Sequence, residues 1–140
     1  MNPSRHDRYE VVPVGFVRSP ISTPDRAPRQ GRDAGLEVVL EILPAYEPAL
    51  QGIERWPQLV VLCWMHRGVR DRLQVVPRGD PALPLAGVFA TRSPHRPNPL
   101  AVYTVDLLEV RGRCLRVRGV DAVDGTPVVD LRPHVPRLDR

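Results

Sequence analysis

The sequence contains no lysine, and all 20 of its basic residues are arginines. Without lysine the chain has no Walker A phosphate-binding residue, no Schiff-base nucleophile and no lysine general base. A genome rich in G and C would produce the same bias, so the absence alone assigns no function. It does exclude the enzymes whose chemistry depends on that amine.

Long apolar runs are also missing. The longest spans seven residues, 59–65, whereas a membrane-spanning helix needs about 20. The first ten residues, MNPSRHDRYE, are polar and lack the apolar stretch of a secretory signal peptide. We therefore expect a cytoplasmic protein without a membrane segment.

Cysteine and metal-binding patterns are equally scarce. Cys63 and Cys114 lie in apolar stretches without a CxxC pair, which is typical of buried thiols in a reducing compartment. The four histidines are scattered, and the chain contains no HExxH, GxSxG or GxGxxG motif. The sequence therefore predicts neither a metal site nor a Rossmann-type cofactor fold.

Proline, by contrast, is abundant, with 17 residues in a chain of 140. Because proline disrupts helices and central strands, this content predicts many loops and few helices. The length suits one domain, which we expect over 1–140 with a polar tail at about 1–9. The net charge of +4 favours a phosphate-bearing partner, although a solvated arginine-rich surface would have the same composition.

Short segments rich in β-branched residues indicate a β-rich chain. One of them, 59–65, is apolar on both faces and is expected to be a central, fully buried strand. Close spacing of such segments favours an all-β barrel or sandwich. Strands are predicted at 10–17, 36–42, 59–65, 87–90, 102–110, 113–120 and 126–131.

Two glycine-containing pairs, Arg111-Gly112 and Asp124-Gly125, are turn signals, and each predicts a hairpin. Only 44–53 has a helical composition, and its proline and glycine limit it to a turn or two. Long loops are expected at 22–35 and 92–99, and loops of that length are often functional.

Polar residues suited to chemistry concentrate in three segments, 27–32 (APRQGR), 63–67 (CWMHR) and 87–100 (GVFATRSPHRPNPL). The third combines prolines with two arginines, a histidine and an asparagine. Prolines restrict the backbone and so lower the entropy cost of holding polar groups in one geometry. Such a loop suits an anionic or nucleotide-like ligand, although a stiff surface loop would read the same way.

These segments closely resemble the TsaA-like family, also called TrmO-type tRNA methyltransferases. The resemblance rests on 87–100 and on DAVDGTPVVDLRPHVP at 121–136. GFVRSP at 15–20, APRQGR and the Trp-X-His-Arg ending at Arg67 match in the same order. It extends from about residue 15 to residue 139.

The resemblance implies a single closed or nearly closed β-barrel that binds S-adenosylmethionine, forms a homodimer and has at most one or two short helices. It also implies methylation of the N6 nitrogen of threonylcarbamoyladenosine beside the tRNA anticodon. Carried over to this sequence, the cofactor residues are Pro28, Arg29, Gln30, His66, Arg67, Arg92, Val102, Val123, Asp124, Gly125 and Thr126.

These residue types suit that ligand. Arginines can hold its carboxylate, Asp124 can favour its positive end, and turn amides can read its adenine. The two valines would line the pocket. The catalytic residue stays unassigned, with Asp124 and His66 as candidates for the general base.

Three departures from the family pattern keep alternatives open. The sequence ends at Arg140 without a further C-terminal domain, Ala-Val-Tyr follows PNPL, and Arg132-Pro133-His134 replaces a lysine-proline-tyrosine. A small-molecule methyltransferase therefore remains an alternative. The absence of an assignable general base leaves a non-catalytic S-adenosylmethionine sensor as another. Arg116 and Arg118, on one strand face with Cys114, would form either an RNA-facing stripe or a solvated exterior.

Overall fold

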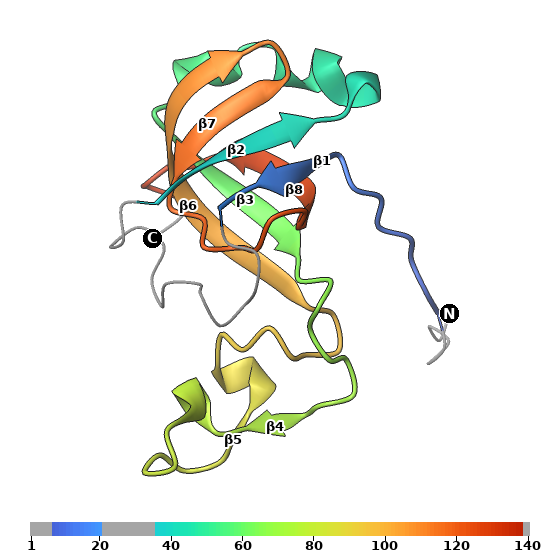
Figure 1. The fold of residues 1–140 in the computed structure, drawn as a ribbon, viewed down its shortest axis with the longest axis vertical. Helices are drawn as coiled ribbons and strands as arrows, with labels where there is room; N and C mark the ends of the chain where they lie inside the picture. The colour runs from blue at the N-terminus through green and yellow to red at the C-terminus, as the bar shows by residue number, and fades with distance from the viewer. Residues whose placement is uncertain (1–6, 21–35, 139–140) are drawn as a thin grey trace.

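A six-stranded antiparallel β-barrel dominates the computed structural model, which describes residues 7–20 and 36–138 (Figure 1). This confirms the all-β prediction and settles it as a closed barrel. The strand order around the barrel is β1-β2-β7-β6-β3-β8. The strands are β1 (Gly15–Arg18), β2 (Glu37–Ile42), β3 (Gln58–Trp64), β6 (Leu100–Arg111), β7 (Cys114–Arg118) and β8 (Pro127–Pro133).

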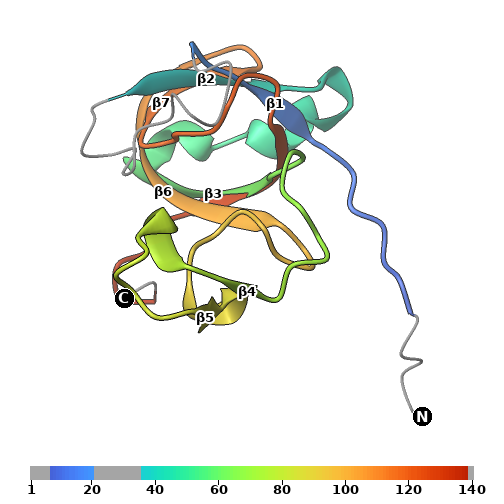
Figure 2. The same cartoon turned by 60° about the horizontal axis from the view of Figure 1, so that its bottom comes forward.

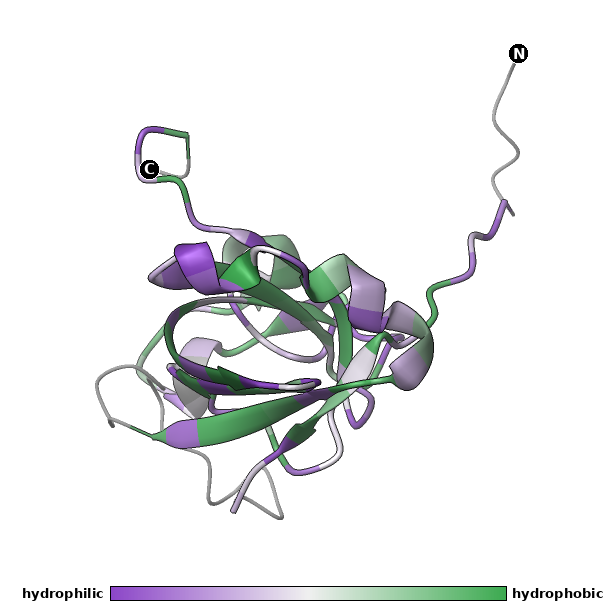
Figure 3. Cartoon of the chain, turned by 90° about the horizontal axis from the view of Figure 1, so that it is seen from above, coloured by the Kyte–Doolittle hydropathy of each residue, from purple (hydrophilic) through white to green (hydrophobic). Residues whose placement is uncertain are grey.

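Alternation of buried and less buried residues along the strands builds the core. In β2 and β3 every second side chain points inward, and Leu40, Leu59 and Val61 are among the core residues without solvent exposure. Figure 3 shows the hydrophobic character of these strands. The outward residues of β3 are only half-buried, so the expectation of a strand buried on both faces is wrong.

Pairing between the first and last strands closes the barrel. Gly15 and Phe16 of β1 lie opposite Val128 and Pro127 of β8, and β8 also pairs with β3 along its length. The Asp124-Gly125 turn therefore does not join neighbouring strands, because β7 and β8 are separated in the strand order. The predicted second hairpin is wrong, and the turn belongs to a crossover between two walls of the barrel.

The first predicted hairpin is confirmed with a one-residue shift. β6 and β7 pair from Asp106 opposite Arg118 to Arg111 opposite Cys114, so that the two-residue loop is Gly112-Arg113. The register shifts between Leu107 and Glu109, and such irregularities increase the local twist of a strand pair.

The predicted helical segment forms two 3₁₀ helices, η2 (Pro44–Leu50) and η3 (Ile53–Arg55). Pro48 lies inside η2, where it prevents the hydrogen bonding of a regular α-helix. The helices lie between β2 and β3 in the chain, and Leu50 adds to the barrel core.

Residues 65–99 leave the barrel after β3 and return at β6 as a separate lobe, hereafter the lobe (Figures 1 and 2). It contains a two-stranded sheet of β4 (Gln74–Val75) and β5 (Ala86–Gly87) and the 3₁₀ helices η4 (Pro77–Gly79) and η5 (Val88–Ala90). The strand predicted at 87–90 is wrong, because only its first residue is in β5 and the rest is η5.

Hydrogen bonds join the two arms of the lobe near the barrel. The Val69 amide donates to Nδ1 of His95, 3.0 Å away. Gly68 is required here, since a Cβ at this position would overlap the Pro94 carbonyl oxygen. The arm leaving the barrel is therefore held against the arm that returns. In the described ranges no helix has the length and apolar character to cross a membrane.

Candidate functional site

The candidate site lies where the lobe joins the barrel, at the end of β3 and the start of β6. The Met65 amide donates to the Pro99 carbonyl at 2.7 Å, which holds these two chain segments together. His66 and Arg67 follow on an exposed turn, in which the Gly68 amide donates to the Met65 carbonyl. The structure thus places both predicted residues at the mouth of the barrel.

The loop before β6, whose stiffness the sequence predicts from its prolines, is also held by hydrogen bonds among its own polar groups. Arg96 donates from Nη1 to the carbonyls of Thr91 and Ser93 at 3.1 and 3.0 Å. The amide of Ser93 donates to the Thr91 hydroxyl, and that of His95 to the Ser93 hydroxyl. These bonds fix the loop that carries Arg92.

Arg92 connects this loop to β6. Its Nη2 donates to the Val102 carbonyl at 3.0 Å, so two predicted cofactor residues are in direct contact. A carbonyl orients the guanidinium without cancelling its charge, and Arg92 remains exposed. The side chain is therefore available to hold an anionic group.

A half-buried polar cluster lies next to Arg92. The Asp121 carboxylate accepts a hydrogen bond from the Tyr103 hydroxyl and interacts with the Arg92 charge. Burial raises the pKa of Asp121, and the Tyr103 bond and Arg92 oppose that shift. Burial also raises the pKa of Tyr103, and the Tyr103 hydroxyl lies 3.9 Å from the sulfur of Met65.

Asp121 and Tyr103 were not predicted as site residues. In the sequence, the turn signal at Asp124-Gly125 was the feature interpreted in this segment, and Asp121 was given no role. Tyr103 has the pattern of an ordinary strand residue. The two residues come together because the crossover from β7 to β8, which carries Asp121, passes the start of β6, which carries Tyr103. The one available sequence signal was an acidic residue in an otherwise apolar stretch, 120–123.

The predicted Asp124-Gly125-Thr126 turn is attached to β1. Asp124 Oδ1 accepts the Ser19 amide at 3.0 Å, and the Gly125 amide donates to the Val17 carbonyl at 2.7 Å. Gly125 has a φ of 84°, which favours glycine. The buried Thr126 hydroxyl donates to the Val123 carbonyl at 2.7 Å.

The predicted residues in the described ranges form three groups, which are His66 with Arg67, Arg92 with Val102, and Val123 with the 124–126 turn. Asp121 connects the second group to the third, because it interacts with Arg92 and lies two residues before Val123. Val123 is buried and Val102 is exposed, so only Val102 offers its side chain to a ligand directly. Pro28, Arg29 and Gln30 lie outside the described residues.

The two cysteines differ in their environments. Cys63 is buried in the barrel core, and burial raises the pKa of its thiol to about 12. Cys114 is exposed on β7, so the prediction that both cysteines are buried is wrong for Cys114. Across the described ranges no three His, Cys, Asp or Glu side chains are grouped to hold a metal ion.

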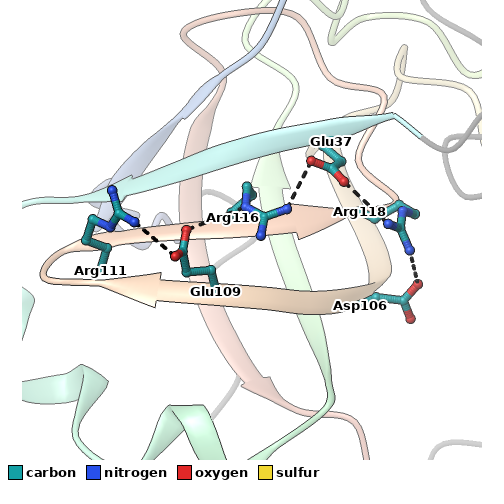
Figure 4. A network of polar contacts seen from close by, with 6 residues as sticks. All are labelled: Glu37, Asp106, Glu109, Arg111, Arg116 and Arg118. Carbon is teal, nitrogen blue, oxygen red and sulfur yellow. Dashed lines mark hydrogen bonds and ion pairs between the residues drawn. The ribbon is translucent and has the colours of Figure 1, made fainter.

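The arginines of β7 belong to an ion-pair network on the barrel exterior (Figure 4). Glu37 accepts from Arg116 and Arg118 at 3.1 and 3.4 Å. Three arginines face three carboxylates in this network, so its formal charge is zero. Of the two readings of this strand, the structure favours the solvated exterior. The members are Glu37, Asp106, Glu109, Arg111, Arg116 and Arg118.

Comparisons with known proteins agree with this architecture. The family model of the tRNA-methyltransferase O N-terminal domain matches residues 16–140. A probable S-adenosyl-L-methionine-binding protein of Methanothermobacter thermautotrophicus is 47% identical over 92% of this chain and 92% of its own length. A probable S-adenosyl-L-methionine-binding protein of Archaeoglobus fulgidus is 50% identical over 90% of this chain, which spans 34% of that protein.

Among solved structures, the crystal structure of TrmO from Pseudomonas aeruginosa superimposes with a TM-score of 0.77 at 34% sequence identity. The match covers 95% of this chain and 59% of that one. The chain thus spans well under two thirds of the length of that enzyme and of the Archaeoglobus relative.

Proposed function

The chain belongs to the tRNA-methyltransferase O N-terminal domain family, and from this premise we propose that it is an S-adenosylmethionine-dependent methyltransferase. The observation that carries the proposal is the Arg92–Tyr103–Asp121 cluster at the mouth of the barrel. S-adenosylmethionine has a carboxylate and a sulfonium, and it supplies a methyl group from that sulfonium when bound. A site with an exposed guanidinium and a half-buried carboxylate offers a partner for each.

Within this site Arg92, already oriented by the Val102 carbonyl, holds the cofactor carboxylate. His66 and Arg67 border the same mouth, and the 124–126 turn lies on the adenine side of the proposed site. The amides of Gly125 and Thr126 donate to the carbonyls of Val17 and Val123, so they hold the turn in place. Asp124 Oδ1 holds the end of β1 through the Ser19 amide, so its first role is to fix the turn. Pro28, Arg29 and Gln30 complete the proposed cofactor set.

Asp121 is the proton acceptor in this proposal. Methylation of an N6 nitrogen forms a nitrogen–carbon bond, breaks the sulfur–carbon bond and releases the proton from nitrogen. A half-buried carboxylate with a raised pKa accepts that proton better than an exposed one. Asp121 therefore replaces the sequence candidates Asp124 and His66 as our choice for the general base.

The proposed acceptor is tRNA, at N6 of threonylcarbamoyladenosine beside the anticodon. The charge of the lobe supports it, because 65–99 contains six arginines and two aspartates, an excess of four that equals the net charge of the chain. Arg70 and Arg96 direct their guanidiniums to backbone carbonyls, which leave their charge uncompensated, whereas Asp121 partly offsets the charge of Arg92. Such a surface attracts phosphates.

A homodimer is proposed as the working assembly. The lobe exposes large apolar side chains, among them Leu73, Leu85 and Phe89, the last with 83% of its surface exposed. Exposed apolar groups concentrated in one region mark contact surfaces. A second copy of the chain would cover them next to the proposed site.

Calorimetric titration with S-adenosylmethionine tests the proposed cofactor. We expect saturable binding that Arg92→Ala weakens at least about ten-fold, since a charge-assisted bond contributes roughly 1.5–3 kcal/mol. The matched control is Arg111→Ala, on the opposite hairpin, which should bind like the wild type. Equal binding by Arg92→Ala and wild type would contradict the assigned site.

Transfer of a labelled methyl group then tests the reaction, with tRNA carrying or lacking the threonylcarbamoyl group as acceptor. Transfer to the modified tRNA that Asp121→Asn abolishes, with cofactor binding retained, is the expected result. Transfer to neither tRNA would overturn the acceptor and direct the search to small molecules. Binding without transfer to any acceptor would instead identify a sensor.

A further inference from the structure

Beside the proposed methyl-transfer site lies a groove with a volume of about 390 Å³. Its lining includes an aromatic ring, a guanidinium and an amide, which come from the two family segments 63–67 and 87–100 and the turn between β3 and β4. We propose that this groove binds an unpaired nucleobase of the acceptor RNA. The inference rests on the proposed RNA acceptor. The groove is lined chiefly by Tyr9, Trp64, Arg70, Asn98, Pro127 and Val129.

Trp64 provides the floor of the groove. It is the last residue of β3, and because Cys63 points into the core, the Trp64 ring is on the outer face. The Arg70 guanidinium carbon lies 5.1 Å from the centroid of this ring. That distance is within the range of a cation–π contact, so the two planar groups form one platform.

The guanidinium of Arg70 is fixed on three sides. Its Nε donates to the Pro97 carbonyl at 2.7 Å, and its Nη2 donates to Asn98 Oδ1 at 3.3 Å. With Trp64 on one face, these bonds set its plane before any ligand arrives. Pre-ordered groups lose less entropy on binding.

This chemistry matches a nucleobase. Proteins bind unpaired bases by stacking them on aromatic rings or on arginine planes, which this platform combines. Asn98 Oδ1 accepts from Arg70, so its amide nitrogen is the group left to donate to a ring nitrogen of the base. The volume of the groove is within the range of small-ligand pockets.

The position of the groove relates it to the proposed reaction. Pro127 follows Thr126 of the cofactor turn, and Trp64 precedes His66 by two residues. A base in the groove would therefore lie next to the cofactor site, and its phosphates would meet the lobe arginines. The stacked base is thereby the group that positions the acceptor nucleotide.

Tryptophan fluorescence tests this directly, because the chain has two tryptophans. In a Trp56→Phe background, Trp64 is the sole emitter. We expect saturable quenching by an anticodon stem-loop RNA, whose loop bases are unpaired. A blunt duplex RNA of equal charge should quench far less, since its bases are already stacked.

Variants separate stacking from charge. Arg70→Ala and Trp64→Ala should each weaken stem-loop binding by roughly ten-fold, in line with the usual contribution of one stacked base. Arg70→Lys should bind the stem-loop little better than Arg70→Ala, because lysine lacks the planar group. Arg111→Ala is the charge-matched control. Trp64→Phe retains a ring and guards against a folding defect, which circular dichroism would reveal.

Two results would overturn the nucleobase site. Equal quenching by duplex and stem-loop would show attraction by charge alone. Undiminished stem-loop affinity in both Arg70→Ala and Trp64→Ala would show that the base lies elsewhere. Both would leave the RNA acceptor intact. Absence of RNA binding by the wild type in a filter assay would overturn the RNA acceptor as well, while cofactor titration reports separately on the methyltransferase.

Discussion

The barrel wall and the lobe use the same residue type in opposite ways. On the wall, Arg116 and Arg118 pair with carboxylates of neighbouring strands. In the lobe, Arg70 and Arg92 donate to backbone carbonyls. A carboxylate cancels the charge of a guanidinium, whereas a carbonyl only orients it. Arginine content therefore says little about ligand binding until the partner of each arginine is known.

The two regions also differ in how they are held together. The barrel encloses a continuous hydrophobic core, including Val17, Leu40 and Leu115. The lobe has short strands and exposes many of its large apolar side chains, and polar contacts join its arms. We conclude that the barrel contains the hydrophobic core, and we propose that the lobe provides the binding surface.

Truncation of a side chain should change the free energy of unfolding much more in the barrel core than in the lobe. Leu59→Ala removes a fully buried side chain from the barrel and should lower the free energy of unfolding by about 2–5 kcal/mol. Leu85→Ala, in the lobe, should change it by less than about 0.5 kcal/mol. Urea titration followed by circular dichroism measures both values.

The same pair of variants examines the proposed dimer. Leu85→Ala should weaken self-association, which sedimentation velocity over a range of concentrations would detect. A large loss of stability in Leu85→Ala at concentrations where the chain is monomeric would break the comparison, because it would give the lobe a core of its own.

Substitution of a lobe arginine should weaken RNA binding more than substitution of a wall arginine. Arg70→Gln should weaken binding to single-stranded RNA by about ten-fold, because it removes the guanidinium plane on which the base is proposed to stack. The slope of log K against log[salt] should change little, because no phosphate contact is assigned to this side chain. The wall control is Glu37→Gln combined with Arg116→Gln, which removes three ion pairs of the network without changing the net charge. Fluorescence anisotropy at several salt concentrations measures both slopes. Equal losses in the two variants would refute the division.

Asp121 lies where the two regions meet, and its substitution should have the smallest of these effects, on the pH dependence of stability. Burial raises its folded-state pKa above the unfolded value, so the folded protein binds the extra proton more tightly. Stability is then lost as the pH rises from the unfolded pKa through the folded one. Asp121→Asn does not titrate, so its stability relative to the wild type should increase over that range.

Urea titrations of both proteins at a series of pH values from mildly acidic to neutral test this. The lost hydrogen-bond partner of Tyr103 would add a constant offset, which the pH dependence separates from the titration. A stability difference that is flat with pH would show that Arg92 and Tyr103 fully compensate for burial.

Much of the fold follows from local patterns. The positions of β2, β3, β6, β7 and β8 were predicted to within a few residues, because alternation of apolar residues is a property of the segment itself. The errors concern pairing, which is not local. The Asp124-Gly125 turn looked like a hairpin, but its amide bonds to β1, more than a hundred residues earlier in the chain.

The candidate site divides in the same manner. The loop was predicted as a rigid, arginine-containing segment, and the family resemblance assigned Arg92 within it to the cofactor. The structure shows that loop held by hydrogen bonds among its own residues. Asp121 was missed because its burial and its contact with Tyr103 exist only after β7, the crossover and β6 are assembled.

By itself the sequence determined that arginine carries every strong positive charge and that the chain forms a β-rich domain. Only the tertiary structure decided which of these charges are paired with a carboxylate. Glu37 pairs with Arg116 and Arg118 across 79 and 81 residues of chain, whereas Arg92 finds its carbonyl ten residues away. Pairing of β2 with β7 brings distant charges together on the barrel wall. In the lobe, Arg70 and Arg96 keep their charge, because their partners are carbonyl and amide oxygens.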